Sequence, residues 1–292
     1  MNNKATLNLN YSGRFKAEVL KDNEVVRESC WSDNIVVNNY LNNIASDSGN
    51  TGGIGSIAVG TGTTAPAATD TALVNQIGTT SNSVDSSSTN QVTVVPYYAS
   101  DSYTFIFNIG EVSGNITEVS ANTFSGGIAS RALFRDEFGD PTSVTVLADE
   151  QLRVTYEMRL TIPDTDVLAT VNGYNLTIRP SSASGTAWSP GLSIIDSTAN
   201  PRITAYSGPI GDFTAFPSGT QANASSVTVE PYVVDSFQRE FTYTWDTASA
   251  NFDIQSFRSY QSVAFQIGVD PVIPKTSNDL LSLTVLYSLG RP

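Results

Sequence analysis

The feature that most constrains the fold is a set of segments that recur in the same order in both halves of the 292-residue chain. Residues 92–97 read VTVVPY and residues 227–232 read VTVEPY. In each half an Asp-Ser-aromatic triplet and an aromatic segment follow, and each half closes on a related run, LRVTYEMRL at 152–160 and LSLTVLYSL at 281–289. Several matches in one order indicate an internal duplication.

The repeated segments have the periodicity of β-strands. Apolar residues alternate with polar ones, which places one face of a strand in a core and the other toward solvent. The alternating apolar positions are Phe105, Phe107 and Ile109 in the first copy, Phe241, Tyr243 and Trp245 in the second, and Leu152, Val154, Tyr156, Met158 and Leu160 in the closing run of the first. We interpret these side chains as sandwich core. A platform for stacking sugars or bases is the alternative.

Composition favours the all-β class, because only 15% of the residues are charged and Thr, Ser, Asn, Val and Gly dominate. We predict two tandem, internally duplicated β-sandwich-like domains, at residues 1–165 and 166–292, each of ordinary sandwich size. A hairpin turning at 21–23 and a short helix should precede a loop-rich segment at 46–90. That segment, rich in Ser, Thr, Gly and Asn, is expected to become ordered mainly against a neighbouring subunit.

The residue types that usually carry catalysis are scarce. The chain has no histidine and one cysteine, Cys30, which removes the usual general base and the commonest metal ligands. The carboxylate pairs Asp136–Glu137 and Asp164–Asp166 lie in turn-like segments, and the second lacks the full spacing of a calcium loop. We therefore predict no catalytic residue, no cofactor, no metal site and no enzymatic activity.

The formal net charge of -13 argues against binding to duplex nucleic acid or to an anionic membrane surface. The sequence NNKATLNLNYSG after Met1 lacks the apolar core of a signal peptide. One cysteine permits no internal disulfide, which fits synthesis in a reducing cytoplasm. The expected partners are therefore proteins rather than nucleic acid or membrane.

Residues 57–73, IAVGTGTTAPAATDTAL, contain Gly60 and Gly62 among small residues, which raises the question of a phosphate-binding loop. Such a loop needs a Lys and a Ser or Thr after its last glycine, but Thr63 and Thr64 follow Gly62, and no Lys or Arg lies between Arg27 and Arg131. We predict instead a strand ending at Val59, a glycine turn with unusual φ angles, and a connection through Pro66.

This segment and the preceding NIVVNNYLNNIAS (34–46) resemble the N-terminal region of tailed-bacteriophage virion structural proteins of the tail, fibre or head-associated type. The resemblance covers roughly the first 80 residues and rests on 31–36, 59–66 and 70–73. It implies a candidate assembly segment. Its residues are Trp31, Asn34, Val59, Gly60, Gly62, Pro66, Asp70 and Leu73.

The resemblance implies a non-enzymatic structural component of a bacteriophage virion, made in the bacterial host cytoplasm. It would assemble through β-rich interfaces in the tail or as a capsid decoration, with itself as a homo-oligomer and with other virion proteins. The alternative is a receptor- or glycan-binding module of the adsorption apparatus, with a host surface glycan as ligand and Trp188 as the best stacking residue. A glycoside-cleaving depolymerase is the weakest reading, since no convincing carboxylate pair stands out.

Overall fold

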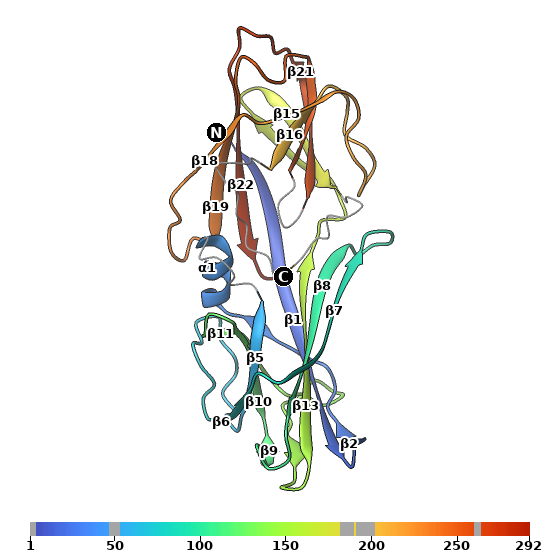
Figure 1. The fold of residues 1–292 in the computed structure, drawn as a ribbon, viewed down its shortest axis with the longest axis vertical. Coiled ribbons are helices and arrows are strands. Elements are labelled where there is room, and N and C mark those ends of the chain that lie inside the picture. The colour runs from blue at the N-terminus through green and yellow to red at the C-terminus, as the bar shows by residue number, and fades with distance from the viewer. Residues whose placement is uncertain (1–3, 47–52, 182–189, 191–201, 260–263) are drawn as a thin grey trace.

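A computed structural model describes residues 4–46, 53–181, 190, 202–259 and 264–292. These residues form twenty-two β-strands and one α-helix, so the predicted all-β class is confirmed. Figure 1 shows two lobes stacked along the long axis, with strands β2 to β13 in one lobe and β14 to β22 in the other. Strand β1 (Ala5–Lys21) runs through both lobes.

One nine-stranded sheet extends through the whole molecule. Besides β1 it contains β2 (Glu24–Glu28), β3 (Ser32–Asp33), β7 (Ser83–Gln91), β8 (Tyr98–Phe107), β13 (Gln151–Thr161), β18 (Ser226–Val229), β19 (Gln238–Trp245) and β22 (Leu281–Gly290). Its main path is β18-β19-β22-β1-β13-β8-β7, while β2 and β3 pair with β1 off this path.

Strand β1 joins the two lobes because it changes neighbours along its length. Its first residues, 5–10, pair in parallel with β22, whereas residues 10–20 pair antiparallel with β13 on the other edge. From Arg14 onward, the edge of β1 that faced β22 pairs first with β3 and then with β2. Residues 5–10 therefore belong to the sheet of the second lobe, although the sequence-based division at 165 assigns them to the first.

Each lobe has a second sheet. In the first lobe it comprises β4 (Ile35–Val36), β5 (Ile54–Gly60), β6 (Gln76–Thr80), β10 (Glu118–Thr123) and β11 (Ile128–Leu133), with a separate pair of β9 (Gly114–Ile116) and β12 (Val144–Val146). In the second lobe it comprises β14 (Val167–Val171), β15 (Tyr174–Pro180), β16 (Ile203–Tyr206), β17 (Gln221–Asn223), β20 (Ile254–Ser259) and β21 (Phe265–Ile273). The architecture is β-sandwich-like.

The strand order is similar in the two lobes, apart from β14, which has no counterpart in the first lobe. In the shared sheet β13-β8-β7 corresponds to β22-β19-β18, and in the second sheets β4-β11-β10-β5-β6 corresponds to β15-β21-β20-β16-β17. The closing runs LRVTYEMRL and LSLTVLYSL lie in the corresponding strands β13 and β22. Superposition of the two halves, as expected of a duplication, remains a prediction.

The aromatic stripes lie in the core, as their alternation predicted. Phe105, Phe107, Phe241, Tyr243 and Trp245 are buried, together with all five apolar positions of the closing run of β13. Ile109 is the exception: it lies beyond the end of β8 and is 62% exposed. Alternation identified the strand but not its last residue.

Two local predictions were wrong. Residues 92–97 do not form a strand, because Gln91 already pairs with Tyr98 and the intervening residues connect β7 to β8. Pro96 has no N–H to give to a ladder. The matching Val227 to Val229 do lie in a strand, β18. The segment 46–90 is less loop-rich than expected, since it contains β5, β6 and β7.

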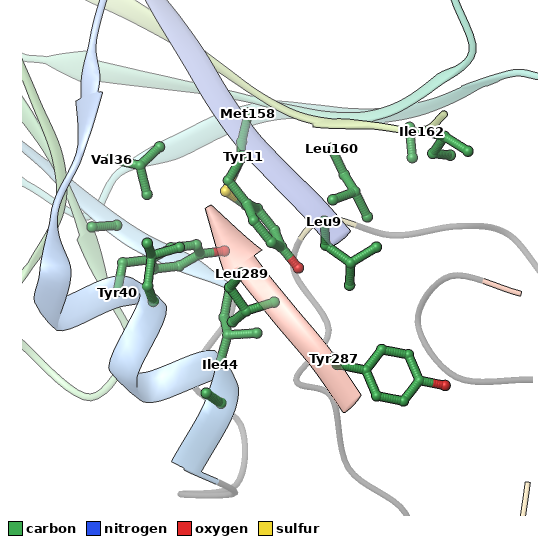
Figure 2. Close-up of a cluster of buried hydrophobic side chains, with 14 of the residues drawn as sticks. Leu9, Tyr11, Val36, Tyr40, Ile44, Met158, Leu160, Ile162, Tyr287 and Leu289 are labelled. Atoms are coloured by element: carbon green, nitrogen blue, oxygen red, sulfur yellow. The ribbon is translucent and has the colours of Figure 1, made fainter. Parts of the chain in front are cut away.

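The expected hairpin and helix near the N-terminus are both present. Asp22 and Asn23 turn the chain between β1 and β2 with φ angles of 52° and 67°, the conformation of a two-residue hairpin turn. Helix α1 (Asn38–Ser46) lies against the point where β1 leaves β22. Figure 2 shows Tyr40 and Ile44 of this helix beside Leu289 of β22 and Tyr11 of β1.

We predict that Leu9→Ala lowers the free energy of unfolding by about 2–5 kcal/mol, the usual cost of emptying a buried leucine site. Leu9 is 1% exposed and lies where β1 pairs with β22. Its neighbour Asn8 is exposed, so Asn8→Ala should change stability by no more than about 0.5 kcal/mol. Urea unfolding checks both. Equal effects of the two changes would contradict the assigned register.

Candidate assembly site

The segment that holds most of the candidate assembly residues forms a closed loop. Strand β5 ends at Gly60, and residues 61–75 return to β6 without regular secondary structure. The N–H of Thr61 donates to the carbonyl of Asn75 at 3.0 Å, which joins the two ends of this 61–75 loop. Thr63, Thr64 and Ala65 at its tip are exposed.

The carboxylate of Glu118 holds both ends of the loop. Glu118, the first residue of β10, is fully buried. Its Oε1 accepts the N–H groups of Gly62 at 3.0 Å and Asn75 at 2.7 Å, and its Oε2 accepts the N–H of Val74 at 3.0 Å. One side chain from a strand thus satisfies three backbone donors that belong to no ladder.

Arg131 of β11 extends the network to the middle of the loop. Its Nε and Nη2 donate to Glu118 Oε2 at 3.1 and 2.9 Å, and its Nη1 donates to Asp70 Oδ2 at 2.7 Å. Nη2 also donates to the carbonyl of Thr64 at 2.8 Å. The Arg131 side chain is 1% exposed, so these acceptors replace its water of hydration.

Burial raises the pKa of Glu118, but the three N–H donors and Arg131 lower it by more, so the pKa lies below its usual value. Glu118 is therefore ionised at neutral pH. A carboxylate with a lowered pKa stabilises the fold above the pKa of the unfolded chain, and this contribution is lost as the pH falls through the lowered value.

Gly60 and Gly62 are explained by the closeness of this carboxylate. A Cβ at Gly60 would lie 2.6 Å from Glu118 Oε1 and 2.5 Å from the carbonyl oxygen of Asn75, and a Cβ at Gly62 would lie 2.5 Å from the same Oε1. Neither glycine has a positive φ. The expectation of unusual φ angles was therefore wrong, and the glycines admit the carboxylate instead.

The other candidate residues separate into three groups. Val59 and Leu73 are buried and anchor the loop to the core, while Pro66 lies in the partly exposed connection. Trp31 and Asn34 lie outside the loop, in the segment between β2 and β4. The Arg14 guanidinium stacks 4.3 Å from the Trp31 ring, and Asn34 donates its backbone N–H to the carbonyl of Gly13 at 3.0 Å. Trp188 lies outside the described residues.

A groove of about 620 Å³ adjoins the loop where β1 changes neighbours. Ala68 of the loop lines it, and the Ala68 carbonyl accepts the N–H of Asn38, the first residue of α1, at 2.7 Å. Charged side chains also line it: Arg14, Asp33, Glu157, Arg159 and Arg291.

Sequence reasoning missed both the groove and the hydrogen-bond network of Glu118 and Arg131, which we call the clamp. Glu118 and Arg131 stand as single charges in the strands EVSANT and IASRAL, which are otherwise apolar or small. An isolated charge in such a strand is the signal that could have identified them, since buried charges are paired.

We predict that Glu118→Gln lowers the free energy of unfolding by about 3–5 kcal/mol, because it leaves the buried Arg131 without its main counter-charge and removes acceptors from the loop amides. Urea unfolding measures the effect. Glu137→Gln is the matched control, since Glu137 is exposed and should change stability by less than about 0.5 kcal/mol. A loss below about 1 kcal/mol for Glu118→Gln would contradict the clamp.

Comparison with known proteins places the chain in no family. It matches no family model, and neither a curated protein nor a solved structure resembles it significantly. Within the described ranges, no cluster of three or more carboxylates and thiols could hold a metal ion. No helix in the same part of the chain is long and apolar enough to cross a membrane.

Proposed function

We propose that the chain is a non-enzymatic structural component of a tailed-phage particle, in the tail or on the capsid surface. The observation that carries the proposal is the fixed conformation of the segment in which the sequence suggests a resemblance to phage structural proteins. It forms a closed loop, fixed by Glu118 and Arg131, with an exposed tip of small residues. Such a loop is suited to contact another protein.

The clamp favours assembly in two ways. A loop held by internal hydrogen bonds loses little conformational freedom when it binds, so less of the interface free energy is spent on ordering. The charged groups of the clamp face inward. The exposed residues of the tip, Thr63, Thr64 and Ala65, have small side chains that allow close contact with a flat protein surface. The proposed partners are other copies of the chain and other virion proteins.

The proposal predicts that the chain is present at a fixed copy number in particles purified from a lysate, as measured by quantitative mass spectrometry. It also predicts that Ala65→Arg reduces incorporation at least tenfold, about 1.4 kcal/mol, because a long charged side chain at the tip obstructs close contact. Ala248→Arg, in an exposed turn of the second lobe, is the matched control and should leave incorporation unchanged.

One result would overturn the structural role, and another would overturn the contact proposed for it. One is a chain that is abundant in the soluble lysate and absent from purified particles. The other is full incorporation of the Ala65→Arg protein, which would remove the loop from the assembly contact. Specific binding of a host surface glycan by the purified chain would favour the adsorption module instead.

A further inference from the structure

A stiff turn at residues 135–140, RDEFGD, presents the most exposed large apolar side chain of the described residues. Phe138 is 82% exposed. The turn is preformed: Asp136 Oδ1 accepts the N–H groups of Phe138 and Asp140, both at 2.9 Å, and Arg135 Nη1 donates to the carbonyl of Gly139 at 2.5 Å. An exposed phenyl ring on a preformed turn can serve as an interface anchor, because the turn needs little further ordering on binding.

The ring is surrounded by negative charge. Asp136, Glu137 and Asp140 flank Phe138, with Arg135 as the one cation of the turn. A complementary surface would therefore combine guanidinium groups, which bind carboxylates and stack on aromatic faces, with an apolar wall.

The groove beside the 61–75 loop has this chemistry. Arg14, Arg159 and Arg291 converge on it, against the two carboxylates Glu157 and Asp33. Arg14 and Arg159 share Glu157, at 3.0 and 2.5 Å, and Arg291 Nη2 donates to Asn38 Oδ1 at 2.6 Å. The side chains of the groove thus carry three guanidinium groups against two carboxylates, an excess of one positive charge in a chain with a net charge of -13.

The apolar lining of the groove also favours an aromatic ligand. Tyr11, Ile35 and Val36 supply apolar lining against which a phenyl ring can pack.

The turn and the groove are neighbours on the surface. The N–H of Arg135, at the start of the turn, donates to Ser32 Oγ at 2.9 Å, and Ser32 directly precedes the groove residue Asp33. Two adjacent, complementary patches are what a twofold interface requires, because each copy then offers its first patch to the second patch of the other.

We propose that a second copy of this chain docks here, each copy inserting its 135–140 turn into the cationic groove of the other. This contact makes a second copy of the chain one partner in the proposed structural role. It rests on that role only where the dimer is placed in a particle. In this dimer Phe138 and the carboxylates beside it contact the groove of the other copy, and the contact is reciprocal. High salt weakens it, because the charges are screened.

Sedimentation equilibrium of the purified full chain over a range of concentrations tests the dimer. The wild-type chain should approach the dimer mass as concentration rises, with a weaker dimer at high salt. Phe138→Ala should raise the dissociation constant at least tenfold. Phe124→Ala is the matched control, because Phe124 is 69% exposed in the turn between β10 and β11, and it should leave the constant unchanged.

Charge reversal tests whether the groove is the surface that receives the turn. Glu137→Arg and Arg159→Glu should each weaken the dimer, and the chain carrying both changes should recover at least part of the lost affinity. Thermal unfolding of each variant separates lost contact from lost folding, and Glu137→Arg changes an exposed side chain outside the core.

A chain that stays monomeric at every concentration would overturn this dimer, as would a dimer that survives both Phe138→Ala and Glu137→Arg. The outcome is separable from that of the proposed function. Particles that still incorporate the Phe138→Ala chain at full copy number would reject the dimer's role in assembly and leave the structural role standing. A dimer in solution whose chain is absent from particles would reject only the structural role.

Discussion

The carboxylate of Glu118 is the constraint on which the candidate site depends. Burying it carries a desolvation cost, and the cost is offset because three backbone N–H groups and Arg131 surround it. The same contacts close the 61–75 loop at both ends, and the closeness of the carboxylate accounts for Gly60 and Gly62. The composition of this loop predicts flexibility, but these contacts fix it in one conformation.

Strand β1 gives this site its position in the molecule. The strand pairs with β22 in one lobe and with β13 in the other, so the lobes share one sheet and one continuous core. The change of neighbours leaves residues 11–13 of β1 outside any strand ladder on one edge. The cationic groove, the start of α1 and the 61–75 loop gather around that stretch. The lobe junction and the candidate site are therefore the same region.

Period-two alternation predicted the core strands well, because it reports directly on which side chains face inward. It could not show that residues 92–97 connect two strands, or that β1 pairs in parallel with β22, because pairing is decided by non-local contacts. Strand β7, SVDSSSTNQ, has no apolar alternation, so its composition predicts a loop. The resemblance drew attention to the 61–75 loop but carried no sign of Glu118, which lies more than forty residues from the loop's last residue.

Amide hydrogen exchange of the isolated chain at low concentration tests the central claim most directly, because it reports whether the 61–75 loop is fixed without a neighbouring subunit. The account predicts that the N–H groups of Gly62, Val74 and Asn75 exchange at least about a hundredfold more slowly than unprotected amides, as those of β10 should. Protection at these three amides that develops only on assembly, with free exchange in the dilute chain, would contradict it.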